Sequence, residues 1–159
     1  MERRCDDIAE LVPHSGTMCL LDSVETWDEH HIVCRATSHL RPDNPLRDGS
    51  GLRTLCAIEY GAQAIAAHAT LLGSGHRQRA AEGVLASLRH VTTTLSHLDG
   101  LKGALTIVAT LHLSHQQGRI YDVTVTADGQ TLLTGRLSVM LEADHSGRPN
   151  PSHRKEPHE

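Results

Sequence analysis

The sequence has very few aromatic side chains: Trp27, Tyr60 and Tyr121 are present, and phenylalanine is absent from all 159 residues. Rings that stack on nucleic acid bases or form a belt at a membrane interface are therefore scarce. Positive charge is also in deficit, because 15 Lys and Arg face 19 Asp and Glu, for a formal net charge of −4. No broad basic field exists to hold duplex nucleic acid or an anionic membrane. We expect neither partner, and we expect an aliphatic core.

Long apolar runs and paired cysteines are missing as well. No apolar segment approaches the roughly 20 residues that span a bilayer, and the first residues, MERRCDD, lack the hydrophobic segment of a secretory signal. We therefore expect a cytoplasmic protein. No C-x-x-C pair occurs, so the cysteines are expected to be reduced thiols rather than a disulfide framework. The 13 histidines share no ligand spacing, and we expect no metal site.

The length and the 38% hydrophobic content fit one ordinary soluble domain. No repeat or internal linker divides the first part of the chain, which predicts a single domain over residues 1–143. Residues 144–159 are rich in proline, histidine and charge, and they are too polar to form a core of their own. We predict a disordered C-terminal tail there.

The segment LCAIEYGAQAIAAHATLL predicts one long helix over residues 55–72. Gly73 follows it, where a helix end favours a residue that tolerates positive φ. The helix is apolar nearly all round, which is typical of a helix enclosed by other structure.

Strand patterns flank this helix on both sides. We predict a short helix over 6–12, a hairpin of strands within 18–26 and 31–37, and an irregular segment over 39–54. Further strands are predicted at 84–95 and, with clear alternation, at 105–113, 121–125 and 133–141, the last after an Asp128-Gly129 turn. This order predicts an α+β fold in which a six-stranded antiparallel sheet wraps around one central helix.

Glu59 and Gln63 are the polar residues near the start of this enclosed helix, one turn apart on the same face. Burying an unpaired carboxylate costs several kcal/mol, so Glu59 must be hydrogen-bonded, neutral or beside a cavity. A desolvated carboxyl group can donate a proton near neutral pH, and Gln63 can orient it. The alternative is an acid that only stabilises the helix N-terminus.

Two motifs give the chain a family resemblance. The segment 11–22, LVPHSGTMCLLD, and the segment 58–63, IEYGAQ, together with the order of elements over residues 5–142, resemble the hotdog-fold 3-hydroxyacyl-[acyl-carrier-protein] dehydratases of the FabZ type. Within that group the chain is most similar to the divergent ApeP-like branch found with aryl polyene pigment clusters. The resemblance implies that a 3-hydroxyacyl thioester on acyl carrier protein loses water to give a trans-2-enoyl thioester, in fatty-acid or aryl-polyene-type biosynthesis. It implies no cofactor beyond the phosphopantetheine that carries the substrate.

The resemblance also suggests residue roles. Glu59 would be the catalytic acid and Gln63 its supporting residue, while the backbone amides of Gly51, Leu52 and Arg53 would bind the thioester carbonyl. At the position of the usual catalytic histidine this chain has Pro45. We predict that His14 acts as the base, with His39 as the second candidate. The alternative for His14 is a structural hydrogen bond in its Pro-His turn.

The same resemblance also implies which partners the chain should have. Hotdog units pair through a sheet edge, so we expect a homodimer or higher oligomer in which the acid of one subunit meets groups of the other. Small helix residues would allow a close approach of the partner: Gly61, Ala62, Ala66 and Ala69. The missing histidine also permits a heteromer with a second dehydratase. Arginines concentrate around the irregular segment and either are solvated or contact the acidic carrier: Arg35, Arg41, Arg47 and Arg53, with Arg77 and Arg79.

Two alternative functions remain open from the sequence. A hotdog acyl thioesterase would use Glu59 to activate water. A non-catalytic subunit would stabilise a second, active dehydratase.

Overall fold

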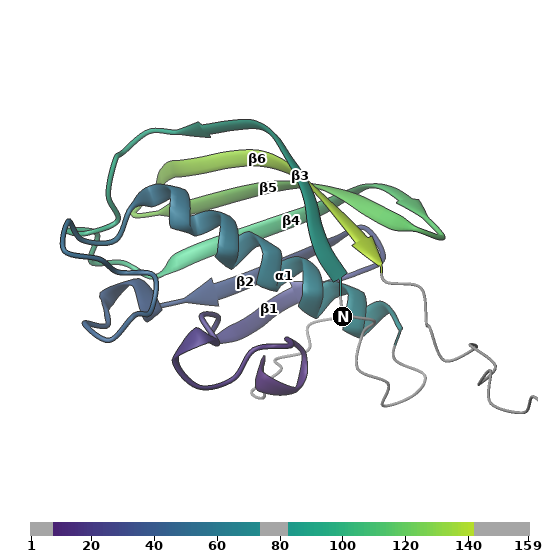
Figure 1. Cartoon of the computed structure of the whole chain (residues 1–159), viewed down its shortest axis with the longest axis horizontal. Helices are drawn as coiled ribbons and strands as arrows, with labels where there is room; N and C mark the ends of the chain where they lie inside the picture. Colours follow the sequence, from purple (N-terminus) through teal and green to yellow (C-terminus); the bar gives the residue numbers. More distant parts are fainter. Residues whose placement is uncertain (1–7, 74–82, 142–159) are drawn as a thin grey trace, which may run out of the picture.

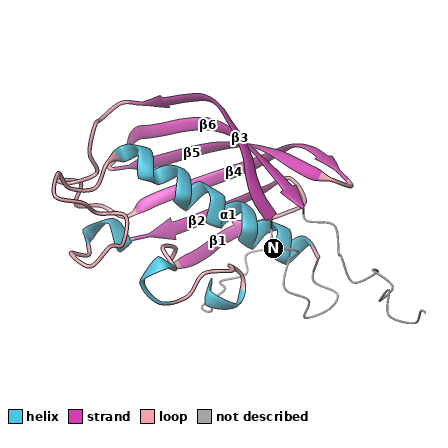
Figure 2. Cartoon of the chain, in the orientation of Figure 1, coloured by secondary structure: helices cyan, strands magenta, loops and turns pink. Residues whose placement is uncertain are grey.

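Six antiparallel strands form one sheet that curls around a single long helix, α1 (Figure 1). The computed structural model describes residues 8–73 and 83–141. The strand order is β1-β2-β4-β5-β6-β3, and Figure 2 shows all six strands beside the one long helix. The elements are β1 (Ser23–Trp27), β2 (His31–Ala36), α1 (Ala57–Leu72), β3 (Gly83–Thr93), β4 (Leu105–His115), β5 (Gly118–Ala127) and β6 (Gln130–Leu141). The predicted fold class is confirmed. The predicted tail over 144–159 lies outside the described residues.

The core lies between α1 and the concave face of the sheet. Alternate residues of β4 face it, and Leu105, Ile107 and Ala109 are fully buried, as the period of two predicts. Strand β5 repeats the pattern with Tyr121, Val123 and Val125. Because the helix supplies many small residues, its axis can lie close to the sheet. The core is aliphatic except for its two tyrosines, as expected from the composition.

Gly61 lies where α1 packs closely against the sheet. A Cβ atom added there would lie 2.7 Å from Cγ1 of Val123, a rigid β-branched side chain that is 1% exposed. Gly61 therefore seats the helix on the sheet of its own chain rather than on a partner, which corrects the role expected from the sequence. Ala62, Ala66 and Ala69 are partly exposed.

Replacing Gly61 by Val should destabilise the fold by about 2 kcal/mol, because a well-packed contact would be overfilled. Urea or thermal unfolding measures this loss. The double variant Gly61→Val with Val123→Ala makes room for the new side chain and should recover part of the stability. An additive double variant would show that the helix does not depend on this contact.

The segment before the first hairpin differs from the prediction. Strand β1 begins at Ser23 instead of Met18, and residues 8–10 and 16–18 form single 3₁₀ turns. The reason is that the backbone of Leu20 bonds to side chains: its N–H donates to Gln63, and its carbonyl accepts from Ser38. A strand partner cannot use the same groups. Residues 6–7 of the predicted short helix lie outside the described residues.

The turns and ends around the other elements are largely as predicted. Asp128 and Gly129 have φ of +52° and +75°, which suits a two-residue hairpin turn that joins β5 to β6. The central helix is preceded by a 3₁₀ turn over Thr54–Cys56. Gly73 ends it with φ of −81°, so the expected positive φ is wrong.

Among the residues that the structure describes, two histidines are buried, and their burial makes the stability of the fold depend on pH. His68 is fully buried and bonds to the Tyr121 hydroxyl and the Asp28 carbonyl, while His39 is 2% exposed. Desolvation lowers the pKa of both rings. The unfolded chain therefore binds protons below about pH 6.5 that the folded chain resists.

Stability should consequently fall as the pH is lowered from about 7.5 to about 5.5, before most carboxylates titrate. The urea midpoint at several pH values measures this. His30→Gln, at an exposed turn position, should leave the slope unchanged. A midpoint that stays constant over this range would contradict the prediction.

Candidate active site

His14 and Glu59 meet at the start of the helix. The His14 Nε2 atom lies 3.3 Å from Oε1 of Glu59, and the two side chains are 34% and 31% exposed. Glu59 lies in the first turn of α1, and His14 lies in the turn before β1. The structure thus brings together the acid and the first candidate base that the sequence singled out. Both groups are half-buried within the single chain.

Gln63 joins this pair to the segment that carries His14. Its Nε2 donates to the Met18 carbonyl at 2.7 Å and to Oε1 of Glu59 at 3.2 Å. Its Oε1 accepts the N–H of Leu20 at 2.9 Å. The side chain is 1% exposed. Gln63 therefore orients Glu59 and fixes the backbone of the His14 segment, and its polar atoms are already bonded within the chain.

A second buried network fixes the same segment from the other side. The Ser38 hydroxyl donates to the Leu20 carbonyl at 2.7 Å and bonds to the Tyr60 hydroxyl at 2.7 Å. Asn44 Nδ2 donates to Tyr60 and to the Ser38 carbonyl. Tyr60 follows Glu59 in the helix, so the network connects the helix start to the irregular segment 39–54. Sequence reasoning missed Ser38 and Asn44, because no local pattern marks them.

The three residues expected to clamp a thioester carbonyl lie just before the helix. The Gly51 amide bonds to the Asp48 carbonyl, and the Leu52 amide donates to Oδ2 of Asp99 at 2.8 Å. The Arg53 amide has no acceptor within residues 8–73 and 83–141. Gly51 has φ of +109°, and a Cβ there would lie 2.4 Å from Asp99, so this position needs glycine. Of the three amides, only that of Arg53 has no hydrogen bond within the described part of the chain.

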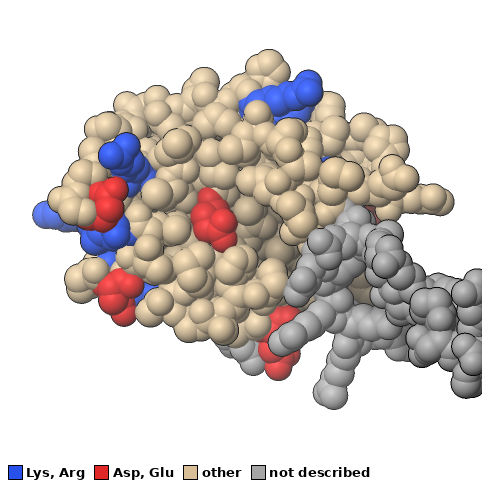
Figure 3. All heavy atoms as spheres, viewed as in Figure 1, with Lys and Arg blue, Asp and Glu red and all other residues tan. Residues whose placement is uncertain are grey.

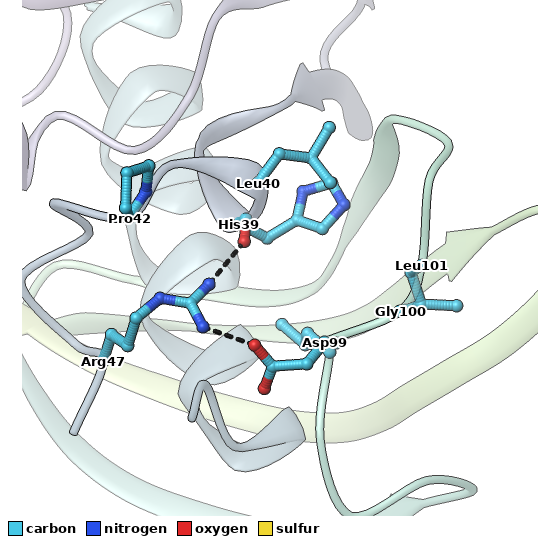
Figure 4. A pocket seen from close by; sticks show the side chains of 8 residues that line it. His39, Leu40, Pro42, Arg47, Asp99, Gly100 and Leu101 are labelled. Atoms are coloured by element: carbon cyan, nitrogen blue, oxygen red, sulfur yellow. Dashed lines mark hydrogen bonds and ion pairs between the residues drawn. The ribbon is translucent and has the colours of Figure 1, made fainter. Parts of the chain in front are cut away.

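His39, the second candidate base, lies apart from Glu59. Its ring nitrogens are buried without a hydrogen bond, next to the backbone of Gly103 and Leu101. His39 lines a pocket of about 340 Å³ with Leu40, Pro42 and the loop 98–101. Figure 4 shows Arg47 bridging this pocket from the His39 carbonyl to Asp99. Neither His14 nor Glu59 lines the pocket.

Arg47 and Asp99 form an ion pair that stabilises the irregular segment. Hydrogen bonds from Arg47 and from the Leu52 amide hold the pKa of Asp99 below its usual range. Arg47 is therefore engaged within the chain. The Arg53 side chain is 64% exposed, and Arg35 also faces solvent. In Figure 3, charge of both signs gathers at the end of the molecule where segment 39–54 lies.

The remaining expectations concern cysteines, metals and membranes. Cys19, Cys34 and Cys56 form no disulfides, and burial raises the pKa of Cys34 to about 12. Across the described ranges, no group of three or more His, Cys, Asp or Glu is placed to hold a metal ion. Within the same residues, no helix has the length and hydropathy of a membrane span. Cys5, Arg77 and Arg79 lie outside the described residues.

An antiparallel sheet wrapped around one long helix is the arrangement of a hotdog-fold protein. Residues 6–147 match the ApeP-like family, whose description is ApeP dehydratase. The chain belongs to this family of dehydratases. A search of curated proteins found no match.

Solved structures show the same fold. The dehydratase heterocomplex ApeI:P from Xenorhabdus doucetiae is 24% identical with a TM-score of 0.75, over 86% of this chain and 91% of that chain. A hypothetical thioesterase with coenzyme A from Streptococcus pneumoniae is 15% identical with a TM-score of 0.55, over 75% and 84%. The PaaI protein of E. coli is 16% identical with a TM-score of 0.53, over 74% and 80%. At these identities the likeness shows the fold alone.

Proposed function

We propose that this dehydratase removes water from a 3-hydroxyacyl thioester carried on acyl carrier protein and releases a trans-2-enoyl thioester. The observation that carries the proposal is the contact of 3.3 Å between His14 Nε2 and Glu59 Oε1. It joins a group that can take a proton to a group that can give one. Phosphopantetheine enters with the substrate, and no other cofactor is required.

The geometry supports a cycle in two steps. Neutral His14 takes the α-proton at Nε2, and Glu59, as the carboxylic acid, protonates the departing hydroxyl to form water. His14 is then protonated and Glu59 is ionised. Because their atoms are in contact, the proton can return directly from His14 to Glu59 after product release. Gln63 stabilises the intermediate carboxylate by donating to Oε1.

The thioester carbonyl needs a donor while charge develops on its oxygen. The Arg53 amide supplies it in our proposal, since the amides of Gly51 and Leu52 are bonded within the chain. These two residues hold the loop that presents Arg53. Asp99 fixes the loop by accepting the Leu52 N–H.

The test is incubation of the purified chain with a 3-hydroxyacyl carrier protein, followed by mass spectrometry. A loss of one water from the acyl group supports dehydration. Release of free thiol would instead support the thioesterase alternative. That alternative is favoured by the partial exposure of Glu59, because an exposed carboxylate can activate water. An unchanged substrate, with dehydration appearing only when a second dehydratase subunit is added, would support the non-catalytic role.

Assembly with a second hotdog subunit is part of the proposal. Strand β3 is an edge of the sheet and carries three exposed apolar residues. Val84 is 54% exposed, Leu85 39% and Leu88 43%. An uncovered apolar edge favours pairing with another strand. A homodimer or a heteromer with a second dehydratase would both cover it, and the partner would then enclose the half-buried acid.

In our proposal, arginines contact the acidic carrier protein. The KM for the carrier-bound substrate should therefore depend on the salt concentration. We expect KM to rise several-fold in high salt, and also in the variant Arg35→Gln with Arg41→Gln, while kcat changes little. The matched control is the same acyl group on free pantetheine, whose KM should not respond. Equal salt dependence of the two substrates would contradict carrier recognition by these arginines.

A further inference from the structure

The pocket beside His39 has a partly exposed carboxylate in its wall. Asp99 lines this pocket, and its side chain is 40% exposed. Arg47 donates to the Asp99 carboxylate from one side (Figure 4), and the Leu52 amide donates to it from the chain segment before α1. Because a carboxylate has about four acceptor sites, Asp99 is held in place and still has acceptor sites for a ligand.

The charges and the apolar surface of the pocket indicate what kind of group binds there. A cationic ligand would be repelled by the guanidinium of Arg47, and an anionic ligand would be repelled by Asp99. The group that fits is therefore a neutral N–H or O–H donor. Apolar side chains from both walls surround the carboxylate, and they suit methylene groups beside that donor: Leu40, Pro42, Leu98 and Leu101.

Asp99 also lies close to the amide that binds the thioester carbonyl in our proposed function. Its Oδ2 atom is 2.8 Å from the Leu52 nitrogen, and the Arg53 nitrogen, the next in the chain, is about 3–4 Å further on. In a pantetheine thioester, three bonds, or about 4 Å, separate the sulfur from the nearer amide nitrogen. A thioester bound at the Arg53 amide therefore has this amide within reach of Asp99.

We propose that Asp99 accepts a hydrogen bond from the substrate, namely from the amide N–H that lies nearest to the thioester in the pantetheine arm. The inference rests on the proposed function, because it takes the position of the thioester from the Arg53 amide. It makes Asp99 a substrate-binding residue in addition to its contact with Leu52. A hydrogen bond to a carboxylate is stronger than one between neutral groups, so Asp99 selects thioesters that carry this amide.

Two small substrates that differ in one group test the proposal. The same 3-hydroxyacyl group is attached to N-acetylcysteamine, which has the amide, and to 2-acetoxyethanethiol, in which an ester oxygen replaces the N–H. The wild type should dehydrate the amide substrate with a kcat/KM about 10-fold higher or more, because a hydrogen bond to a charged group is lost with the ester. Equal kcat/KM values for the two substrates would overturn the proposal.

Variants of Asp99 assign the preference to this side chain. Asp99→Ala should bring the ratio of the two kcat/KM values close to one, and Asp99→Asn, which keeps an oxygen for the Leu52 N–H, should lower the ratio as well. A structural effect on the loop would instead lower both values equally and keep the ratio, which would contradict substrate binding by Asp99. Asp43→Asn, at an exposed position of the same irregular segment, is the matched control and should keep the wild-type ratio.

A binding measurement separates this inference from the proposed function. Pantetheine labelled with ¹⁵N at both amides is added to the full-length wild-type chain and observed by NMR. The proton signal of the amide nearer to the sulfur should move to lower field, while that of the farther amide moves less, and Asp99→Asn should abolish the difference. An equal response of the two amides would overturn the inference. A wild type that shows the expected shift without dehydrating either substrate would contradict the proposed function alone.

Discussion

Replacing Glu59 by Gln is expected to lower kcat for dehydration by about 10³- to 10⁴-fold, near the upper limit for loss of a general acid. Glutamine keeps the size of the side chain, and its carbonyl can still accept the hydrogen bond from Gln63. It cannot give a proton to the departing hydroxyl. The loss should therefore appear in kcat, while KM for the carrier-bound substrate changes little.

Two measurements separate this chemical effect from a structural one. The thermal unfolding midpoint of Glu59→Gln should stay near that of the wild type, because the contacts of the side chain are kept. Glu29→Gln, which removes an acid at an exposed turn, is the matched control and should be fully active. Wild-type turnover in Glu59→Gln would exclude Glu59 as the proton donor.

Replacing His14 by Asn should lower kcat by about 10²- to 10⁴-fold, because the base that takes the α-proton is lost. Asparagine is polar and fits the partly exposed turn, so the fold should be kept. The return of the proton to Glu59 after each cycle would also lose its donor. Single-turnover and steady-state kinetics together measure both effects.

His39 provides the matched control for His14. Its ring is buried among backbone groups of the 101–103 loop and does not contact Glu59. His39→Gln should lower the unfolding midpoint and leave kcat of the folded protein within a small factor of the wild type. The opposite pattern, an inactive His39→Gln and an active His14→Asn, would assign the base to His39. Pro45, which by the family resemblance stands where the catalytic histidine is expected, cannot take a proton.

Local patterns were sufficient to predict the helix and the later strands. The alternation of buried residues in β4 and β5 follows from a period of two, and the Ala-rich run of α1 follows from helix propensity. The Asp128-Gly129 turn could be predicted from the sequence, because the positive φ angles of a tight hairpin turn favour these residue types. Glu59 and Gln63 were paired correctly because one helical turn separates them.

Errors arose where side chains from distant segments replace backbone pairing. The sequence pattern predicts a strand from residue 18, whereas β1 begins at Ser23, because nothing near Leu20 reveals that Gln63 and Ser38 bind its backbone groups. The small residues of the helix predict that Gly61 faces a partner, but the atom that requires a glycine there belongs to Val123 of the same chain. The hydrogen bond from the Leu52 amide to Asp99 also cannot be predicted from the sequence, because the two residues come from separate loops.

The sequence alone determined the fold class and the family and singled out Glu59 as the candidate acid, because these depend on periodicity and on short motifs whose residues are neighbours in the chain. Only the tertiary structure decided which histidine contacts Glu59 and that the contact forms within one chain. Folding brings His14 to the helix through the hydrogen bonds of Gln63 and Ser38, and such long-range bonds depend on how the whole sheet closes around α1.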